Sequence, residues 1–358
     1  MLVLVAALIG GWSWFWSYAS GKIQAAVEGW RAREATAGRI YTCGSENLGG
    51  YPFRFELNCD RASALFQSNR PPVELKAQGI LVVAQVYQPN LLISEIHGPL
   101  TVAAPGQPPE FVVNWKQFMS SVRGTPRVPE RVSLVWDRPV IDHVVDGRSQ
   151  TLFRADHAEI HGRLAQGSVA DHPAIEVGLR LKGGLSPSFA ATAAQPVNAT
   201  IDTVLRGLKD FSPKPWHERF RQMQAAGGKI EITQARVEQG ETLAVGAGNV
   251  SINPDGRLQG QLSVTVAGLE PFLKSIGAQK MIEQSKAVDK LAGVLDRLSP
   301  GLGSVAREQV GANISAGIKM LGQQATLEGK PAVTLPLRID DGAMFLGPIP
   351  LGNAPALF

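Results

Sequence analysis

The chain has 358 residues, of which 44% are hydrophobic and 18% are charged, so its length and composition allow a packed globular core. It carries 35 Lys and Arg against 31 Asp and Glu, a net charge of +4, without the basic runs typical of nucleic-acid-binding proteins. Composition and charge therefore predict a folded protein with no nucleic-acid partner.

Residues 1–20 form an uncharged apolar and aromatic run. Its length is close to the ~20 residues that a helix needs to cross a bilayer. Its second half holds residue types that favour the membrane interface: Trp12, Trp14, Phe15, Trp16 and Tyr18. A cleaved signal peptide needs a basic N-terminal region, which is absent here. We expect an uncleaved transmembrane anchor at 1–20. The alternatives are a signal peptide and a buried helix, and the missing basic flank also fits a natural start upstream of Met1.

Residues 21–38 continue with helical periodicity. Apolar residues recur there three or four positions apart, at Ile23, Ala26, Val27 and Trp30. The polar residues Gln24, Glu28, Arg31 and Glu34 lie elsewhere around the helix. We predict a helical stalk at 21–38 that extends the anchor.

The chain contains two cysteines, Cys43 and Cys59, on either side of a turn-rich stretch. Two adjacent strands would bring them within bonding distance, and the disulfide would contribute roughly 3 kcal/mol in the loop-entropy model. The alternative is a pair of reduced, buried thiols. A zinc site lacks ligands, because no histidine lies nearby. Disulfides persist in oxidising compartments, so this pair favours a body outside the cytoplasm.

An aromatic stripe follows the turn at Gly49 and Gly50. Apolar residues alternate there with polar ones, which predicts a strand with one buried face; they are Tyr51, Phe53, Phe55 and Leu57. This stripe either lines an apolar groove or packs in the core, and the core is the more common role on strands.

Short strand-like runs then alternate with turn residues, which predicts antiparallel meanders. They occupy 73–86, 91–102, 111–115, 132–140, 151–164 and 175–181. A connection at 185–198 leads to a predicted helix over 201–226, broken near Pro213 and Pro215. A second strand block spans 229–266. Helices are expected at 271–276, 281–298 and 303–321, before a last strand segment around 333–339.

These elements predict an α+β fold, with antiparallel β meanders in a large curved sheet, packed helices and one N-terminal transmembrane helix. The expected parts are the anchor 1–20, the stalk 21–38, a first β-rich part 39–184, a connection and helix 185–226, and a second β-rich part 227–358. The two β-rich parts are expected to form one continuous body.

Four short motifs and the anchor together resemble domain-of-unknown-function family 2125. The motifs are Gly-Gly-Tyr-Pro-Phe-Arg-Phe at 49–55 with Cys59 after it, Ala-Ala-Gly-Gly-Lys-Ile at 225–230, Asp-Gly-Arg at 255–257, and Leu-Gly-Pro-Ile-Pro at 346–350. The resemblance implies a membrane-anchored envelope protein of Gram-negative bacteria. More loosely, the chain is similar to AsmA-like proteins, whose β-sheets form apolar grooves associated with lipid transport or outer-membrane assembly. No site residues follow from either resemblance.

The strongest catalytic candidates are four histidines, His143, His157, His161 and His172. Of these, His157 and His161 would share one face of a strand with Glu159. His143 and His172 lie in the same acidic interval. Such a face can contribute to a metal site, but a polar, solvated strand face is the more common arrangement. We therefore expect neither an enzyme, a cofactor nor a metal site.

Two functions remain open for a single-pass inner-membrane protein with its body in the periplasm. In the first, the sheet binds phospholipid or acyl chains in an apolar groove, where burial of each methylene supplies roughly 0.8 kcal/mol. In the second, the protein is a structural or assembly partner that binds other envelope proteins through sheet edges and carries no ligand.

Overall fold

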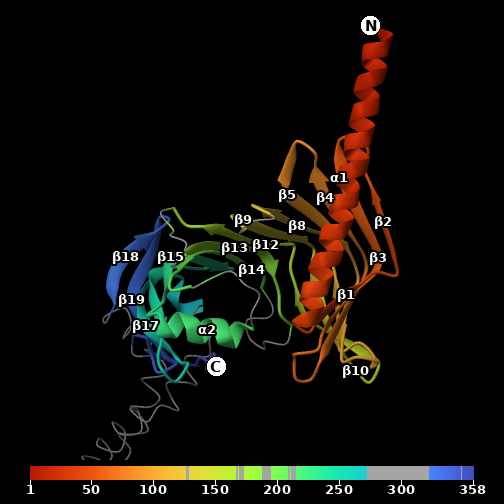
Figure 1. Cartoon of the computed structure of the whole chain (residues 1–358). Coiled ribbons are helices and arrows are strands. Elements are labelled where there is room, and N and C mark those ends of the chain that lie inside the picture. The colour runs from red at the N-terminus through yellow and green to blue at the C-terminus, as the bar shows by residue number, and fades with distance from the viewer. Residues whose placement is uncertain are drawn as a thin grey trace, which may run out of the picture. The chain divides into compact units, whose positions relative to one another are not determined.

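The computed structural model describes residues 1–125, 129–166, 168, 173–187, 195–208, 210, 215–271, 322–347 and 349–358 (Figure 1). The chain divides into two compact units, Met1–His161 and Gly162–Phe358. Antiparallel strands dominate both units, so the predicted antiparallel β-structure behind an apolar N-terminal helix is confirmed. The curvature of the sheet, the packed helices and the expected domain boundaries stay predictions.

The anchor and the stalk form one continuous helix, α1 (Leu2–Thr36). At 1.5 Å per residue its 35 residues extend about 52 Å. The helix is long and apolar enough to cross a membrane. It ends at Ala37, and Gly38 then adopts a left-handed φ of 75°, which only glycine takes without strain. Its N-terminal end projects beyond the strands of its unit (Figure 1).

The first unit is built around two long strands, β3 (Arg54–Phe66) and β4 (Val73–Gln85), which pair over their whole length. The outer side of β3 pairs with β1 (Arg39–Thr42) and β2 (Ser45–Gly49). From β4 one branch continues through β5 (Gln88–His97), β8 (Gln117–Arg123) and β9 (Arg131–Asp137). The other continues through β6 (Leu100–Ala103), β7 (Phe111–Asn114), β10 (Val140–Val145) and β11 (Arg148–Arg154). Strand β12 (His157–Leu164) pairs with β9.

The second unit is a meander of long strands. Its neighbours in order are β13 (Ile175–Gly184), β14 (Val197–Leu205), β15 (Lys229–Gln239), β16 (Thr242–Ile252), β17 (Leu258–Ala267) and β19 (Lys330–Asp340). Strands β18 (Gln323–Leu327) and β20 (Ala343–Leu346) also pair with β19, and β21 (Ile349–Asn353) pairs with β20. Helix α2 (Trp216–Ala225) contributes Met223 to a core cluster with Leu208 and Ile252.

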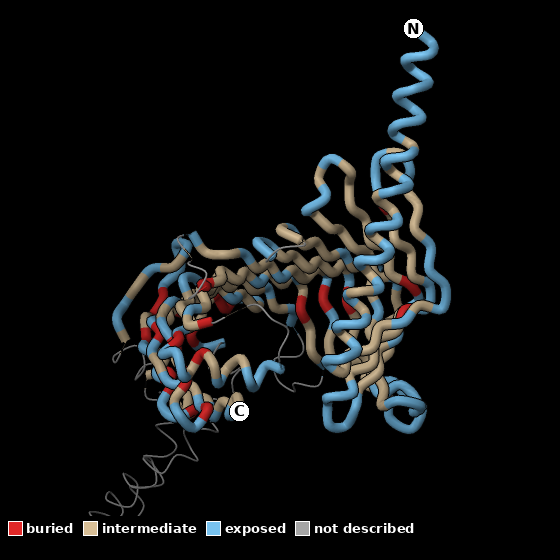
Figure 2. The backbone as a smooth tube through the Cα atoms, viewed as in Figure 1, coloured by how far each residue is buried: buried red, intermediate tan, exposed pale blue. Residues whose placement is uncertain are grey.

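Buried side chains are concentrated on the strands of this second unit (Figure 2). Val250, Leu262 and Ile339, from three neighbouring strands, form one buried cluster. Leu335 and Val266 are almost completely inaccessible. The alternating apolar residues of this unit therefore form an ordinary packed core.

One predicted element is wrong. The helix expected over 201–226 is a helix only at Trp216–Ala225, whereas Ile201 to Leu205 belong to strand β14. This strand pairs with β13 on one side and β15 on the other, and its Ile, Thr and Val residues favour a strand. The helices expected at 271–276, 281–298 and 303–321 lie outside the described residues, apart from position 271.

Candidate functional site

The aromatic part of α1 is hydrogen-bonded to the loop between β2 and β3. The indole nitrogen Nε1 of Trp12 donates to the carbonyl of Pro52 at 3.0 Å, and Nε1 of Trp16 donates to the carbonyl of Arg54 at 3.1 Å. The hydroxyls of Ser13 and Tyr51 lie 2.9 Å apart. The end of the sheet is therefore fastened to the apolar half of the helix.

Ring stacking reinforces this junction. Trp16 lies parallel to Phe55, with ring centroids 5.5 Å apart, and edge-on to Tyr51 at 5.6 Å. Such aromatic pairs contribute about 0.5–1.5 kcal/mol beyond their burial. Phe55 is only 7% exposed, so this ring near the start of β3 is buried where it stacks on the helix.

The stalk is attached farther along the same strands. Trp30 stacks on Tyr41 of β1 with a centroid distance of 4.8 Å. At the end of the helix, Glu34 forms an ion pair with Arg39. The hydrogen bond from Arg39 lowers the pKa of Glu34 below its ordinary value, so this carboxylate stays charged at neutral pH.

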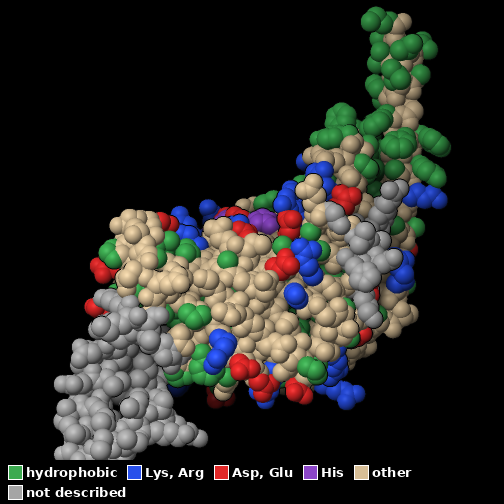
Figure 3. Space-filling view, turned by 90° about the vertical axis from the view of Figure 1, so that its left-hand side faces the viewer, with side chains coloured by type: hydrophobic (Ala, Val, Ile, Leu, Met, Phe, Trp, Pro, Cys, Tyr) green, Lys and Arg blue, Asp and Glu red, His purple; other side chains and the backbone are tan. Residues whose placement is uncertain are grey.

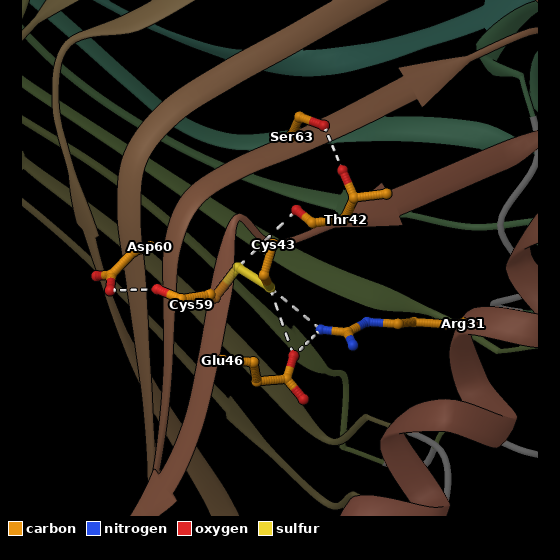
Figure 4. Close-up of a disulfide and its surroundings, with 8 residues drawn as sticks. Arg31, Thr42, Cys43, Glu46, Cys59, Asp60 and Ser63 are labelled. Carbon is orange, nitrogen blue, oxygen red and sulfur yellow. Dashed lines mark hydrogen bonds and ion pairs between the residues drawn. A yellow bond between two sulfur atoms is a disulfide. The ribbon is translucent and has the colours of Figure 1, made fainter.

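A disulfide joins Cys43, between β1 and β2, to Cys59 on β3, with Cα atoms 5.3 Å apart. Figure 4 shows Arg31 reaching from α1 toward this bond. Its guanidinium donates to the Cys43 sulfur at 3.3 Å and forms an ion pair with Glu46 on β2. The disulfide therefore ties the segment before β2 to β3, and Arg31 attaches this segment and β2 to the stalk.

The aromatic stripe expected from the sequence divides into two pairs. Phe55 and Leu57 lie on β3 and point to the face that α1 partly covers. Tyr51 and Phe53 precede the strand and are 50% and 67% exposed. The first pair therefore belongs to a sheet face, and the second to the end of the sheet beside the anchor.

The strand register shows how far this face extends. Directly opposed residues in antiparallel strands share a face. Leu57 is opposite Val82, Val82 is opposite Ser94, Ser94 is opposite Ser120, and Ser120 is opposite Leu134. We call the apolar residues that this register places on the same side as Ser94 and Ser120 the apolar face: Phe55, Leu57, Ile80, Val82, Ala84, Leu92, Ile96, Phe118, Val122, Val132, Leu134 and Trp136.

The apolar face is only partly covered. Of its members, Phe55 alone is buried, and the others are half-buried. Among the described residues of the first unit, the buried hydrophobic side chains are Phe55, Ala62 and Ala155, whereas the second unit has a well-buried core. A sheet face packed against its own core would bury many more side chains. The half-exposed face therefore offers contact area to an apolar occupant.

The opposite face of the same strands carries a chain of hydrogen bonds. The two ring nitrogens of His157 lie 2.6 Å from carboxylate oxygens of Asp137 and Glu159. Glu159 also contacts Nε2 of His161 at 2.7 Å, and Nδ1 of His161 lies 2.9 Å from the hydroxyl of Ser133. The space-filling view shows histidine beside acidic side chains on this surface (Figure 3).

This chain of hydrogen bonds brings together His157, Glu159 and His161. Strand β9, which pairs with β12, adds Asp137 of the acidic interval and Ser133, and the sequence pattern did not identify Ser133. The hydrogen bonds that His157 makes to the carboxylates of Glu159 and Asp137 raise the pKa of His157, and those that Glu159 accepts from His161 and His157 lower the pKa of Glu159. Both ring nitrogens of His157 and of His161 have a hydrogen-bond partner. The positive charge of a protonated His157 is therefore matched by the carboxylates beside it on the strand face.

The other histidine candidates lie apart from this cluster. His143 stacks on Phe111 at 4.9 Å, and His172 lies outside the described residues. Within the part of the chain that the structure describes, no group of three or more His, Cys, Asp or Glu residues is arranged to hold a metal ion.

A family model described as an uncharacterized protein conserved in bacteria, DUF2125, matches residues 16–355. None of the curated proteins matches the chain.

Proposed function

The chain belongs to the DUF2125 family of uncharacterised proteins conserved in bacteria, and we propose that it is a membrane-anchored envelope protein that binds lipid on its apolar face without catalysis. The observation that carries this proposal is the half-exposed apolar face next to an apolar helix. Neither feature needs a reactive residue, because an acyl chain is held by burial alone.

The anchor is supported by the exposure of the helix end. Large apolar side chains at the start of α1 are widely exposed, among them Leu2, Leu4, Leu8 and Ile9. Exposing so much apolar surface to water is unfavourable, at roughly 25 cal/mol per Å². A bilayer removes this penalty.

The disulfide at Cys43 and Cys59 supports a body in the oxidising periplasm, which leaves the anchor in the inner membrane.

The identity of the occupant is supported by continuity between helix and sheet. The apolar face begins at Phe55, which stacks on Trp16 inside the uncharged run of α1. An acyl chain that leaves the bilayer along the helix would therefore meet apolar side chains from the start. Each methylene that moves onto the face instead of into water contributes roughly 0.8 kcal/mol.

The proposal is tested on the full chain purified in detergent, by native mass spectrometry and lipid extraction. The double variant Val122→Gln/Leu134→Gln places two amides on the apolar face. Its matched control, Met119→Gln/Val135→Gln, places the same amides on the opposite face of the same two strands. Neither variant changes α1, so any lipid that stays bound to this helix contributes equally to both measurements.

We expect co-purified phospholipid in the wild type and in the control, and at least about a tenfold loss in the variant of the apolar face, since two desolvated amides cost about 2–6 kcal/mol together. A wild type that carries no lipid after purification, and binds none when phospholipid is added, would contradict lipid binding. That outcome would favour an assembly partner that binds other envelope proteins.

A further inference from the structure

We propose that the end of the sheet beside α1 inserts into the membrane interface, so that the bilayer is held by the helix and by three aromatic side chains of the sheet. These residues, Tyr51, Phe53 and Tyr87, are called the sheet tip. The inference rests on the proposed membrane anchor and adds a second lipid-contacting surface to it.

The sheet tip is exposed and apolar. Tyr51, Phe53 and Tyr87 are 50%, 67% and 76% exposed. They come from two loops that lie side by side, because the amide of Val86 donates to the carbonyl of Phe53 at 3.0 Å. Figure 3 shows hydrophobic side chains along the projecting part of α1 and on the adjoining end of the body. Tyrosine and phenylalanine at such a position suit a membrane interface.

The depth of the sheet tip follows from its bonds to the helix. The loop that carries Tyr51 and Phe53 is bonded to Trp12, Ser13 and Trp16. These residues precede Ser20, the end of the uncharged run, by about 6–12 Å along the helix axis at 1.5 Å per residue. A bilayer that accommodates residues 1–20 therefore reaches the level of the sheet tip.

The backbone carbonyls of the loop at 50–54 accept hydrogen bonds from within the protein, as a water-poor environment requires. Carbonyl groups in a membrane need protein donors, because water is scarce there. The carbonyl of Gly50 accepts from the amide of Arg54, and that of Phe53 accepts from Val86. The carbonyls of Pro52 and Arg54 accept from the two indoles of α1. These four carbonyls are satisfied within the protein, although the loop is exposed.

Basic side chains surround the sheet tip on the side of the body. Lys22 follows the uncharged run and lies over the ring of Tyr18, and Arg54 starts β3. Arg123 and Arg131 face one another at the corresponding ends of β8 and β9. All four are exposed, and basic side chains lie just below the hydrophobic end in Figure 3. This arrangement matches phosphate headgroups above apolar chains.

The test is the depth of spin labels on the full chain in vesicles of phosphatidylethanolamine and phosphatidylglycerol. Labels are attached at Phe53→Cys and, independently, at Tyr87→Cys; the native cysteines are paired with each other. Leu8→Cys reports the helix, and Asp146→Cys, in the turn between β10 and β11, reports an exposed turn of the same unit outside the sheet tip. Collision with oxygen and with a water-soluble nickel complex measures depth.

We expect labels at 53, 87 and 8 to be exposed to oxygen and protected from nickel, and the label at 146 to be exposed to nickel. A buried label at position 8 with water-exposed labels at 53 and 87 would overturn the insertion of the sheet tip and leave the anchor intact. A water-exposed label at position 8 would overturn both.

Discussion

Two residues determine how firmly the hairpin near the stalk is closed. The disulfide between Cys43 and Cys59 spans 16 positions of the chain. A loop of this length restricts the unfolded state by about 3 kcal/mol. We therefore expect Cys43→Ser/Cys59→Ser to lower the free energy of unfolding by about 3 kcal/mol in urea titrations. A reductant should lower the free energy of unfolding of the wild type by a similar amount and leave that of the variant unchanged. A wild type whose free energy of unfolding does not respond to reductant would contradict a structural disulfide.

His157 gives the polar cluster a defined pH dependence. Its hydrogen bonds to Glu159 and Asp137 raise its pKa above the ordinary 6.5. The folded pKa exceeds the unfolded one, so the stabilisation is complete below about pH 6.5 and is lost as the pH rises through the raised value. The lowered pKa of Glu159 keeps that carboxylate charged throughout this range.

We therefore expect His157→Gln, which removes the positive charge, to lower the free energy of unfolding more at about pH 6 than at about pH 9. Chemical denaturation at both pH values measures the difference. The control His97→Gln makes the same substitution at the exposed end of β5, outside the histidine cluster. An equal effect of His157→Gln at both pH values would show that the charge of the imidazole contributes nothing.

The junction between α1 and the sheet depends on Trp16. Its ring stacks on Phe55, and its indole nitrogen bonds the carbonyl of Arg54. Loss of this packing and of the hydrogen bond should cost about 2 kcal/mol. We expect Trp16→Ala to lower the melting temperature in detergent and to speed amide exchange at 53–56.

Trp14 provides the matched control. It lies in the same helix, is 71% exposed and stacks only on Tyr18 of α1 among the ring contacts of the described residues. Trp14→Ala should leave exchange at 53–56 unchanged. Equal effects of the two substitutions would mean that the helix is not fastened to the sheet through Trp16.

The sequence predicts a helix or strand well where its apolar residues follow a single periodicity. The uncharged run and the helical spacing of Ile23 to Trp30 predict the two halves of α1, and period-two alternation predicts most strands. The sequence pattern predicts a helix over Ile201 to Leu205, whereas pairing with β13 and β15 makes this stretch a strand. Single-chain patterns do not contain that pairing.

The candidate site was less accessible to prediction, because it depends on register. The sequence places Phe55 and Leu57 on one face, but their continuation through Val82 to Leu134 follows only from strand pairing. The same holds for Ser133 and Asp137, which β9 contributes to the histidine cluster. Contacts between Trp16 and Phe55, far apart in sequence, likewise require the folded chain.

At the scale of the whole molecule, the two units are both built from antiparallel strands but differ in how far they bury their apolar side chains. The second unit buries its apolar residues in clusters such as Val250, Leu262 and Ile339. The first leaves the apolar face half-exposed, next to a helix that can cross a membrane. We infer a division between a self-contained unit and one whose apolar surface is completed by lipid.

Membrane attachment by both helix and sheet tip predicts a graded response to shortening. Deletion of residues 2–11 removes the projecting end of α1 and keeps Trp12, Ser13 and Trp16 with their bonds to the loop. We expect the shortened chain to be released from membranes by high salt, because its remaining attachment is interfacial and partly electrostatic. The full chain should need detergent. A shortened chain that resists salt extraction would contradict a spanning role for residues 2–11.

The most direct test of lipid binding on the apolar face is photo-crosslinking of the full chain in vesicles with a phospholipid that carries a diazirine on its acyl chain. Mass spectrometry of the peptides then locates the adducts. We expect adducts within 80–84, 92–96, 118–122 and 132–136, in addition to α1, and their loss in Val122→Gln/Leu134→Gln but not in Met119→Gln/Val135→Gln. Adducts confined to α1 and the sheet tip would contradict a lipid on the apolar face.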